Sequence, residues 1–309
     1  MPDTSVIIAT KDRATVLGDT LESLSRVRGI ERTEIIVVDN GSTDETRSVA
    51  ASFACRLRVR YILEVRPGVG AARTTGALAA HGSLLLFADD DVYFHPHWFE
   101  TYEAWCADPT GYQLFGGPVM PKFEGAPPPQ WLFRFAPASI RGFGLGNADM
   151  EVKETLFLGA NFAVRASALS RVGYFHPNLG AGCAASGHEK WLFRQLLDGG
   201  ARARYLASAR VWHRVRPETC TPEYIASLQE RVARNLVLTG REPRARFGYK
   251  VNGVPARVWY RYVESYLGLW KARAFGSPDE LRYKALARWH RFKGMTSALA
   301  SLHRNKEGR

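Results

Sequence analysis

The stretch EIIVVDNGSTD, from Glu34 to Asp44, indicates the fold class of this 309-residue chain. Four consecutive β-branched aliphatic residues run directly into Asp39, Asn40 and Gly41, which predicts a buried strand that ends in a polar turn. A helical pattern from Thr43 to Phe53 follows. A buried strand, a polar turn and a helix in this order are typical of one unit of an α/β sheet.

The same alternation continues on both sides of this stretch. Thr4 to Ala9 and Val59 to Leu63 are further strand patterns, and Thr15 to Arg26 is spaced as a helix. The Ala-rich helical segment Ala71 to Ala80 then leads into a fourth strand pattern, Ser83 to Ala88. This spacing predicts βαβ units and a mostly parallel sheet. Because ligands bind at the carboxyl ends of strands in open α/β sheets, the polar residues after each strand should line one crevice.

Composition excludes several classes of protein. The chain is 46% hydrophobic and 23% charged, which is ordinary globular composition and argues against disorder. Its apolar runs fall far short of the roughly 18 residues that span a bilayer, and its start lacks the pattern of a secretory signal. Cys55, Cys106, Cys183 and Cys220 are scattered without C-x-x-C spacing. We therefore expect reduced cysteines, no cysteine-based zinc site and a cytoplasmic location.

Three adjacent carboxylates, Asp89, Asp90 and Asp91, follow the fourth strand pattern. Such neighbours raise one another's pKa unless something compensates their charge. A divalent cation removes this repulsion, and carboxylate oxygens are the ligands that Mg²⁺ and Mn²⁺ prefer. Asp89 and Asp91 point in one direction if the extended backbone continues. The alternative is a solvated acidic turn that caps the next helix.

Asp39 and Arg73 are candidate nucleotide ligands. Asp39 either accepts hydrogen bonds from a base or a ribose, or belongs to a turn in which Ser42 or Thr43 caps the next helix. The segment Gly68 to Gly76 fails as a dinucleotide loop, because Arg73 stands at the third glycine position. Arg73 could instead meet a diphosphate or a nucleobase, and the alternative is a surface arginine.

Seven motifs in chain order resemble those of the family 2 glycosyltransferases, a GT-A class that uses nucleotide-diphospho sugars. They are Val6 to Arg13, Ile36 to Asp44, Gly70 to Arg73, Phe87 to Asp91, Phe157 to Leu169, Gly187 to Leu192, and Val211 to His213. The similarity covers residues 4–225. The chain departs from the family at Ala9, Lys11 and Asp12, where Pro, an aromatic residue and Asn are commoner. His188-Glu189 also replaces the usual acidic pair.

The resemblance implies a role for each candidate residue. The nucleotide would be contacted by Ala9, Thr10, Arg13, Asp39, Arg73, Asp89 and Asp90. The metal, Mg²⁺ or Mn²⁺, would be held by Asp89, Asp91 and His213. Glu189 would be the general base, and the acceptor side would include Asn161, His188 and Trp191.

The expected fold is α/β of GT-A type, with a mostly parallel central sheet flanked by helices over residues 1–225 and a helical, basic extension over 226–309. The expected activity is metal-dependent, inverting transfer of a sugar from a nucleotide-diphosphate donor, a UDP-sugar by family frequency. The acceptor would be a hydroxyl of a glycan or lipid-linked glycan in polysaccharide biosynthesis. One alternative is a nucleotidyltransferase, but Ala9 to Arg13 lacks the glycine which that class needs. The other is a non-catalytic sugar-nucleotide-binding protein of the same fold.

The basic charge of the chain is concentrated at its end. Residues 241–309 carry 16 Lys and Arg against 5 Asp and Glu, whereas residues 1–240 carry 26 against 25. One face of the helical pattern Val254 to Arg273 carries Trp259, Val263, Tyr266 and Trp270. Aromatic, basic amphipathic helices suit an anionic membrane interface, so we expect peripheral contact at the inner membrane face. The alternative is that the aromatic residues dock on the catalytic domain. We expect no nucleic-acid partner, because no nucleic-acid module is visible.

Overall fold

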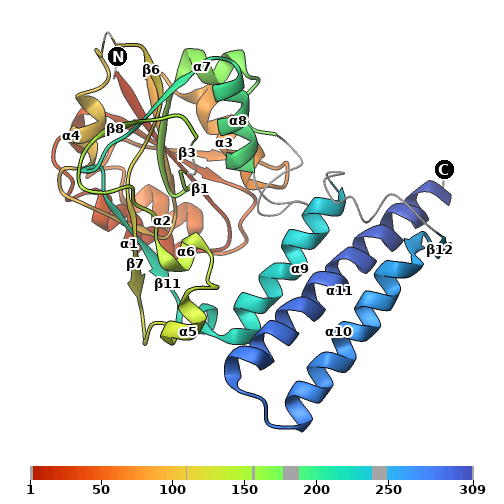
Figure 1. Cartoon of the computed structure of the whole chain (residues 1–309). Helices are drawn as coiled ribbons and strands as arrows, with labels where there is room; N and C mark the ends of the chain where they lie inside the picture. Colours follow the sequence, from red (N-terminus) through yellow and green to blue (C-terminus); the bar gives the residue numbers. More distant parts are fainter. Residues whose placement is uncertain (1–2, 109, 155–156, 177–187, 239–248, 308–309) are drawn as a thin grey trace. The chain divides into compact units, whose positions relative to one another are not determined.

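The computed structural model describes residues 3–108, 110–154, 157–176, 188–238 and 249–307 (Figure 1). The predictions for Cys183 and Gly187 lie outside these residues. The chain forms two compact units. The first comprises Met1–Lys122, Arg141–Cys183 and Gly187–Val215, and the second comprises Phe123–Ile140, Ala184–Ser186 and Arg216–Arg309.

The first unit is built on an eight-stranded sheet in the order β3-β2-β1-β4-β9-β6-β10-β8. Its strands are β1 (Thr4–Thr10), β2 (Glu34–Asp39), β3 (Val59–Leu63), β4 (Leu84–Asp89), β6 (Tyr112–Gly116), β8 (Met150–Val152), β9 (Asn161–Arg165) and β10 (Arg202–Tyr205). The pairs among β3, β2, β1 and β4 are all parallel, as predicted. From β9 onward the sheet is mixed, because β9 runs antiparallel to both β4 and β6. The α/β class and the large central sheet are therefore confirmed.

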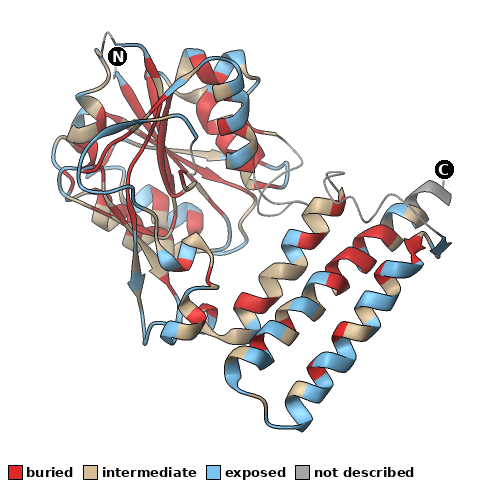
Figure 2. Ribbon diagram, viewed as in Figure 1, coloured by how far each residue is buried: buried red, intermediate tan, exposed pale blue. Residues whose placement is uncertain are grey.

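Helices cover both faces of this sheet. They are α1 (Ala14–Leu24), α2 (Thr46–Ser52), α3 (Val69–Ala79), α4 (Trp98–Glu103), α7 (Ala166–Arg171) and α8 (His188–Asp198). On β1, Val6 and Ile8 belong to the core that contains Leu17 of α1, whereas Ile7 belongs to the core that contains Ala72 of α3. All three β1 side chains are fully buried, and the buried residues of Figure 2 follow the strands. This two-sided burial explains the continuous aliphatic runs in the sequence.

Two details of the first unit position its polar residues. A Cβ at Gly76 would lie 2.5 Å from Cγ2 of Ile7, so glycine allows α3 to pack closely on β1. A second, three-stranded sheet in the order β5-β11-β7 contains β5 (Val92–Phe94), β11 (Val211–Val215) and β7 (Val119–Phe123). The antiparallel pairing of β11 with β5 places His213 opposite Val92, directly after the acidic triplet.

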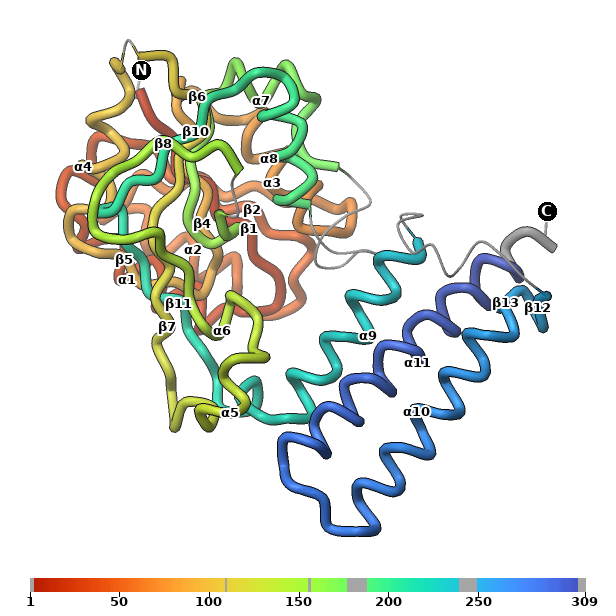
Figure 3. The backbone as a smooth tube through the Cα atoms, in the orientation of Figure 1, coloured from red at the N-terminus to blue at the C-terminus, as the bar shows by residue number. Residues whose placement is uncertain are grey.

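The second unit is mainly helical, and its path is easiest to follow as a tube (Figure 3). Its elements are α5 (Gln130–Phe133), α6 (Ala138–Arg141), η2 (Pro217–Cys220), α9 (Pro222–Leu238), β12 (Lys250–Val251), β13 (Val254–Pro255), α10 (Ala256–Ala274) and α11 (Asp279–Glu307). Helix α11 packs along both α9 and α10. A Cβ at Gly294 would collide with the backbone of Glu230, which shows how closely α11 approaches α9. The domain boundary expected between residues 225 and 226 falls within α9.

Most of the aromatic face predicted for α10 points to solvent, whereas Trp259 at its start packs partly against the core that contains Val254 and Met295. Val263, Tyr266 and Trp270 are 51%, 53% and 57% exposed. The helix packs instead through its other side, where Val258 and Leu269 are buried. Among the described residues, no helix is both long and apolar enough to span a membrane.

Candidate active site

The acidic triplet occupies the turn between β4 and β5, at the carboxyl end of the parallel strands. Asp89, Asp91 and His213 each offer a ligand atom, and these atoms all lie within 4.8 Å of one another. His213 Nε2 lies 3.4 Å from Oδ1 of Asp91. The structure therefore brings together the three residues expected to hold a metal, from β4, the turn after it, and β11.

This cluster fits a divalent cation. Oδ1 of Asp91 and Nδ1 of His213 are buried and have no hydrogen-bond partner in the structure. A buried carboxylate oxygen without a partner is costly, and a bound cation would satisfy it. Two carboxylates and one imidazole suit Mn²⁺ or Mg²⁺ completed by phosphate oxygens and water.

Asp90, the middle carboxylate of the triplet, is held by hydrogen bonds from two side chains. Asp90 is 4% exposed, so this member of the triplet is not a solvated turn residue. Its Oδ1 accepts a hydrogen bond of 2.6 Å from Arg13, and its Oδ2 accepts one of 2.7 Å from Thr10. Arg13 also donates to Asp91 Oδ2 at 2.7 Å. Burial raises the pKa of Asp90 to about 7, against the lowering effect of Arg13.

Arg73 connects the acidic triplet to the start of α8. Its side chain is 1% exposed, so it is not a surface arginine. One terminal nitrogen donates to Asp89 at 2.6 Å and to the Gly159 carbonyl at 2.8 Å. The other nitrogen lies 3.3 Å from Glu189 Oε1 and 2.8 Å from His188 Nε2. A single guanidinium thus holds the predicted base and a predicted metal ligand on either side of itself.

His188 serves this arginine as a neutral acceptor. Burial, followed by the charge of Arg73, lowers the pKa of His188 to about 2. The neutral imidazole can accept a hydrogen bond at Nε2, whereas the imidazolium cannot. The acceptor-side role expected for His188 is untested, and its observed contact is with Arg73.

Asp39 lies at the end of β2 and is 2% exposed. Its Oδ1 accepts a hydrogen bond of 2.8 Å from the Ser42 amide, and its Oδ2 accepts one of 2.7 Å from the Tyr61 hydroxyl. Burial, helped by this hydrogen bond, raises the pKa of Tyr61 to about 12. Neither Ser42 nor Thr43 caps α2, which begins only at Thr46.

Comparison with known proteins identifies the family. Residues 5–173, more than half of the chain, match the model described as glycosyl transferase family 2. The chain belongs to this family. The resemblance drawn from the motifs is confirmed, and with it the expected enzyme class of glycosyltransferases.

Curated relatives of the family match over part of their length. Validoxylamine A glucosyltransferase of Streptomyces hygroscopicus subsp. jinggangensis is 39% identical over 113 residues, which are 36% of this chain and 27% of the relative. The PGL/p-HBAD biosynthesis glycosyltransferase of Mycobacterium tuberculosis is 41% identical over 96 residues, which are 30% of this chain and 37% of the relative. The chain therefore matches well under half the length of these relatives.

Solved structures share the fold. The mannosyltransferase PcManGT from Pyrobaculum calidifontis, in complex with GDP-Man and Mn²⁺, has a TM-score of 0.59 at 18% identity, covering 97% of this chain and 88% of that one. TarS 1-349 of S. aureus in complex with UDP-GlcNAc has a TM-score of 0.56 at 18% identity, covering 98% and 92%. At this identity the likeness establishes the GT-A fold.

Some residues expected in the family's site are placed elsewhere. Asn161 is fully buried, and its Oδ1 accepts from Trp98 Nε1 and the Tyr102 hydroxyl. Its amide nitrogen donates to the carbonyls of Pro118 and Ala209. These four hydrogen bonds use the whole side chain, so they do not support an acceptor-side role.

The remaining two expected residues are Trp191 and Ala9. The ring of Trp191 lies 5.3 Å from that of His176. Ala9 lies within β1, where it pairs with Val38 and Asp89. Any hydrogen bond from Ala9 to the nucleotide would have to come from the backbone, because its side chain is a methyl group.

Three residues that position the site were not predicted from the sequence. Tyr61 holds Asp39, and Gly159 supplies a carbonyl to Arg73. A Cβ at Gly159 would collide with the carboxylate of Glu189, so only glycine permits this approach. Asn40 donates to the carbonyls of Glu64 and Arg66 and accepts from the Gly68 amide, which holds the loop before α3. Its place directly after a strand was the available signal.

Proposed function

We propose that the chain transfers a sugar, with inversion, from a nucleotide-diphosphate donor to a hydroxyl of a glycan or lipid-linked glycan, and that Mg²⁺ or Mn²⁺ is required. The observation that carries this proposal is the bridge made by Arg73 between Asp89 of the metal cluster and Glu189. The structures of PcManGT with GDP-Man and of TarS with UDP-GlcNAc support a nucleotide-sugar donor. A UDP-sugar remains the proposed donor.

The residues of this site are suited to a single displacement. Asp89, Asp91 and His213 would hold the cation, whose charge would stabilise the departing nucleoside diphosphate. Glu189 takes the proton of the acceptor hydroxyl as the acceptor oxygen forms its bond to C1 of the sugar. The bond between C1 and the diphosphate oxygen breaks, and its electron pair leaves with the diphosphate. One displacement inverts the anomeric carbon.

In this proposal the other residues predicted to contact the nucleotide have different roles. Asp39 accepts from the base or the ribose, and the hydrogen bond from Tyr61 fixes the direction of its carboxylate. Arg13 and Thr10 act through Asp90, since their observed bonds keep the acidic turn in place. The proposed transferase domain, residues 1–225, and helical extension, residues 226–309, differ in their bounds from the two compact units, of which the second begins with Phe123–Ile140 and resumes at Arg216.

A binding panel tests the proposed donor and cation. Calorimetric titration with UDP, GDP, dTDP, CMP and NAD should show binding of one nucleoside diphosphate, at least about tenfold tighter with Mn²⁺ than in EDTA. A bound cation would offset the negative charge of both the diphosphate and the Asp89–Asp91 cluster, so binding without it should be weakened by repulsion between like charges. Binding of none of these ligands would favour a non-catalytic protein of the same fold, and metal-independent NAD binding would contradict the proposal.

We also propose that the second unit contacts an anionic membrane surface peripherally, at the inner face. The exposed side of α10 carries Tyr260, Val263, Leu267 and Trp270, which are 65%, 51%, 51% and 57% exposed. Arg257 and Arg261 lie one turn apart beside this apolar face. Apolar residues flanked by basic ones suit the boundary between headgroups and acyl chains.

Replacing two residues of this face tests the membrane proposal. Leu267→Ser with Trp270→Ser should weaken flotation with anionic vesicles at least about tenfold, since burying a large apolar side chain is worth about 1.5–3 kcal/mol. Leu78→Ser is the control, because Leu78 is 62% exposed on α3, outside this face. An equal loss in both variants, or none in either, would contradict the proposed membrane contact.

A further inference from the structure

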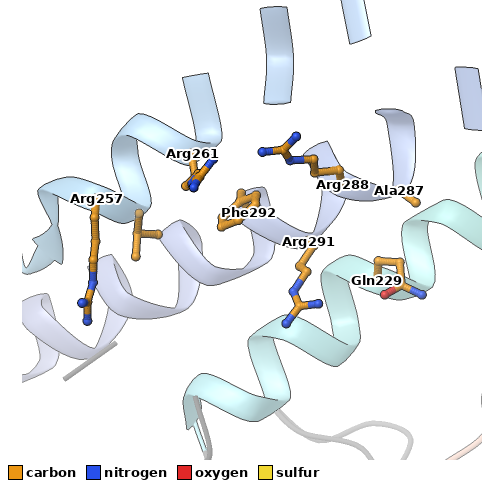
Figure 4. A pocket seen from close by; sticks show the side chains of 8 residues that line it. Gln229, Arg257, Arg261, Ala287, Arg288, Arg291 and Phe292 are labelled. Carbon is orange, nitrogen blue, oxygen red and sulfur yellow. The ribbon is translucent and has the colours of Figure 1, made fainter. Parts of the chain in front are cut away.

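The second unit contains a groove among α9, α10 and α11 with a volume of about 660 Å³. Four of its eight lining residues are arginines, and none of the eight is acidic. Arg257 and Arg261 come from α10, whereas Arg288 and Arg291 come from α11 (Figure 4). The groove is separate from the Asp89–Asp91 cluster, which belongs to the first unit.

The four arginines are arranged as two pairs on facing helices. In each pair the residues are separated by about one helical turn. Figure 4 shows Arg261 and Arg288 on one side of the Phe292 ring, and Arg291 on the other. Arg261 of α10 and Arg288 of α11 therefore bring guanidinium groups from two helices to the same side of this ring.

Glu264 neutralises only part of the charge of Arg261 and Arg288. Arg261 and Arg288 both donate to the same oxygen of Glu264, each at 2.8 Å. Two guanidinium groups therefore share one carboxylate, which leaves a positive surplus at the rim of the groove. Gathering like charges in this way has a cost that a bound anion would offset.

The floor of the groove is apolar. Val258 is 1% exposed and Phe292 is 6% exposed. Concave sites with apolar walls and a few converging polar groups are typical of ligand pockets. Guanidinium groups match the geometry of phosphate oxygens and bind them through paired hydrogen bonds.

We propose that this arginine groove binds the phosphate or diphosphate group of an anionic ligand, with guanidinium groups from both helices on the phosphate oxygens. Phosphates of this kind occur free in solution and as lipid headgroups. None of the eight lining residues carries a carboxylate, and Glu264 at the rim is already paired with two arginines, so binding should not require a divalent metal, unlike the proposed donor binding in the first unit. This difference separates the two sites experimentally.

The test uses the full chain in EDTA with two probes. Inorganic pyrophosphate is titrated by calorimetry, and vesicles of phosphatidylcholine with or without phosphatidic acid are used in flotation. Arg261→Gln with Arg288→Gln should weaken binding at least about tenfold, because each change removes charge-assisted hydrogen bonds. Arg273→Gln with Arg304→Gln is the control, because it removes the same charge at two exposed arginines outside the groove and should change binding less than about twofold.

The outcomes separate the sources of the phosphate. Groove-dependent binding of pyrophosphate supports a free anion, and groove-dependent binding of phosphatidic acid vesicles alone supports a lipid headgroup. Equal weakening in both double variants would overturn the proposal, since it would indicate general charge attraction. Binding of neither probe, or of single-stranded RNA alone, would also overturn it. Retained Mn²⁺-dependent UDP binding in the groove variant shows that a failure here does not concern the transferase site.

Discussion

Glu189→Gln should lower kcat by about 10³-fold and leave the Kd of the nucleoside diphosphate within about twofold, since general base catalysis contributes about 10²–10⁴-fold. The amide has nearly the shape of the carboxylate but cannot take a proton from the acceptor hydroxyl. The bond of 2.6 Å between Arg73 and Asp89 does not involve Glu189, so the metal side should keep its geometry. Turnover is measured under saturating donor, and nucleotide binding is measured by calorimetry.

A matched variant and the nucleotide readout make this test specific. Glu223 occupies the first turn of α9, as Glu189 occupies that of α8, so Glu223→Gln repeats the change outside the first unit. It should leave kcat unchanged. Unchanged turnover in Glu189→Gln would remove Glu189 as the base. Loss of nucleotide binding together with turnover would instead indicate that the Arg73 bridge holds the pocket open.

The parallel half of the sheet could be predicted because its signal is local. Strands β1, β2 and β4 are short runs of buried, mainly aliphatic residues followed by polar ones, and two-sided burial leaves that pattern in the sequence. The mixed half of the sheet was not predicted in this way. Strands β8 and β10 have three and four residues, and their pairing depends on partners distant in the chain.

The candidate site shows the same limit. The carboxylates and Arg73 were identifiable because they follow strands or begin a helix. The residues that hold these side chains in place were not identifiable from the sequence. The contact of Tyr61 with Asp39 spans 22 positions, and that of Gly159 with Arg73 spans 86. The arginine groove depends likewise on the alignment of α10 with α11, which no single helix pattern contains.

The apolar face predicted for α10 illustrates a different failure. Its regular spacing was compatible with docking on protein or with solvent exposure, because periodicity indicates a face and not its partner. The structure leaves Val263 and Trp270 more than half exposed. It buries Val258 and Leu269 instead, although they are less bulky than the aromatic residues.

Asp91→Asn should weaken Mn²⁺ binding at least about tenfold and lower kcat by about 10³-fold, since metal stabilisation of transition-state charge is worth several kcal/mol. Oδ1 of Asp91 is buried without a hydrogen-bond partner and lies beside His213. The amide removes the negative charge that a cation would meet there. Mn²⁺ affinity is measured directly by calorimetry, so the result does not depend on an assay of turnover.

The control for this variant is Asp198→Asn, because the Asp198 side chain is 69% exposed at the end of α8. It should leave both Mn²⁺ affinity and kcat unchanged.

His213→Ala should weaken Mn²⁺ binding as well, because the imidazole belongs to the same cluster. Unaltered Mn²⁺ affinity in both site variants would place the metal elsewhere. A loss of kcat with unaltered Mn²⁺ affinity would instead assign Asp91 to the brace formed with Arg13, whose contact with Oδ2 is 2.7 Å.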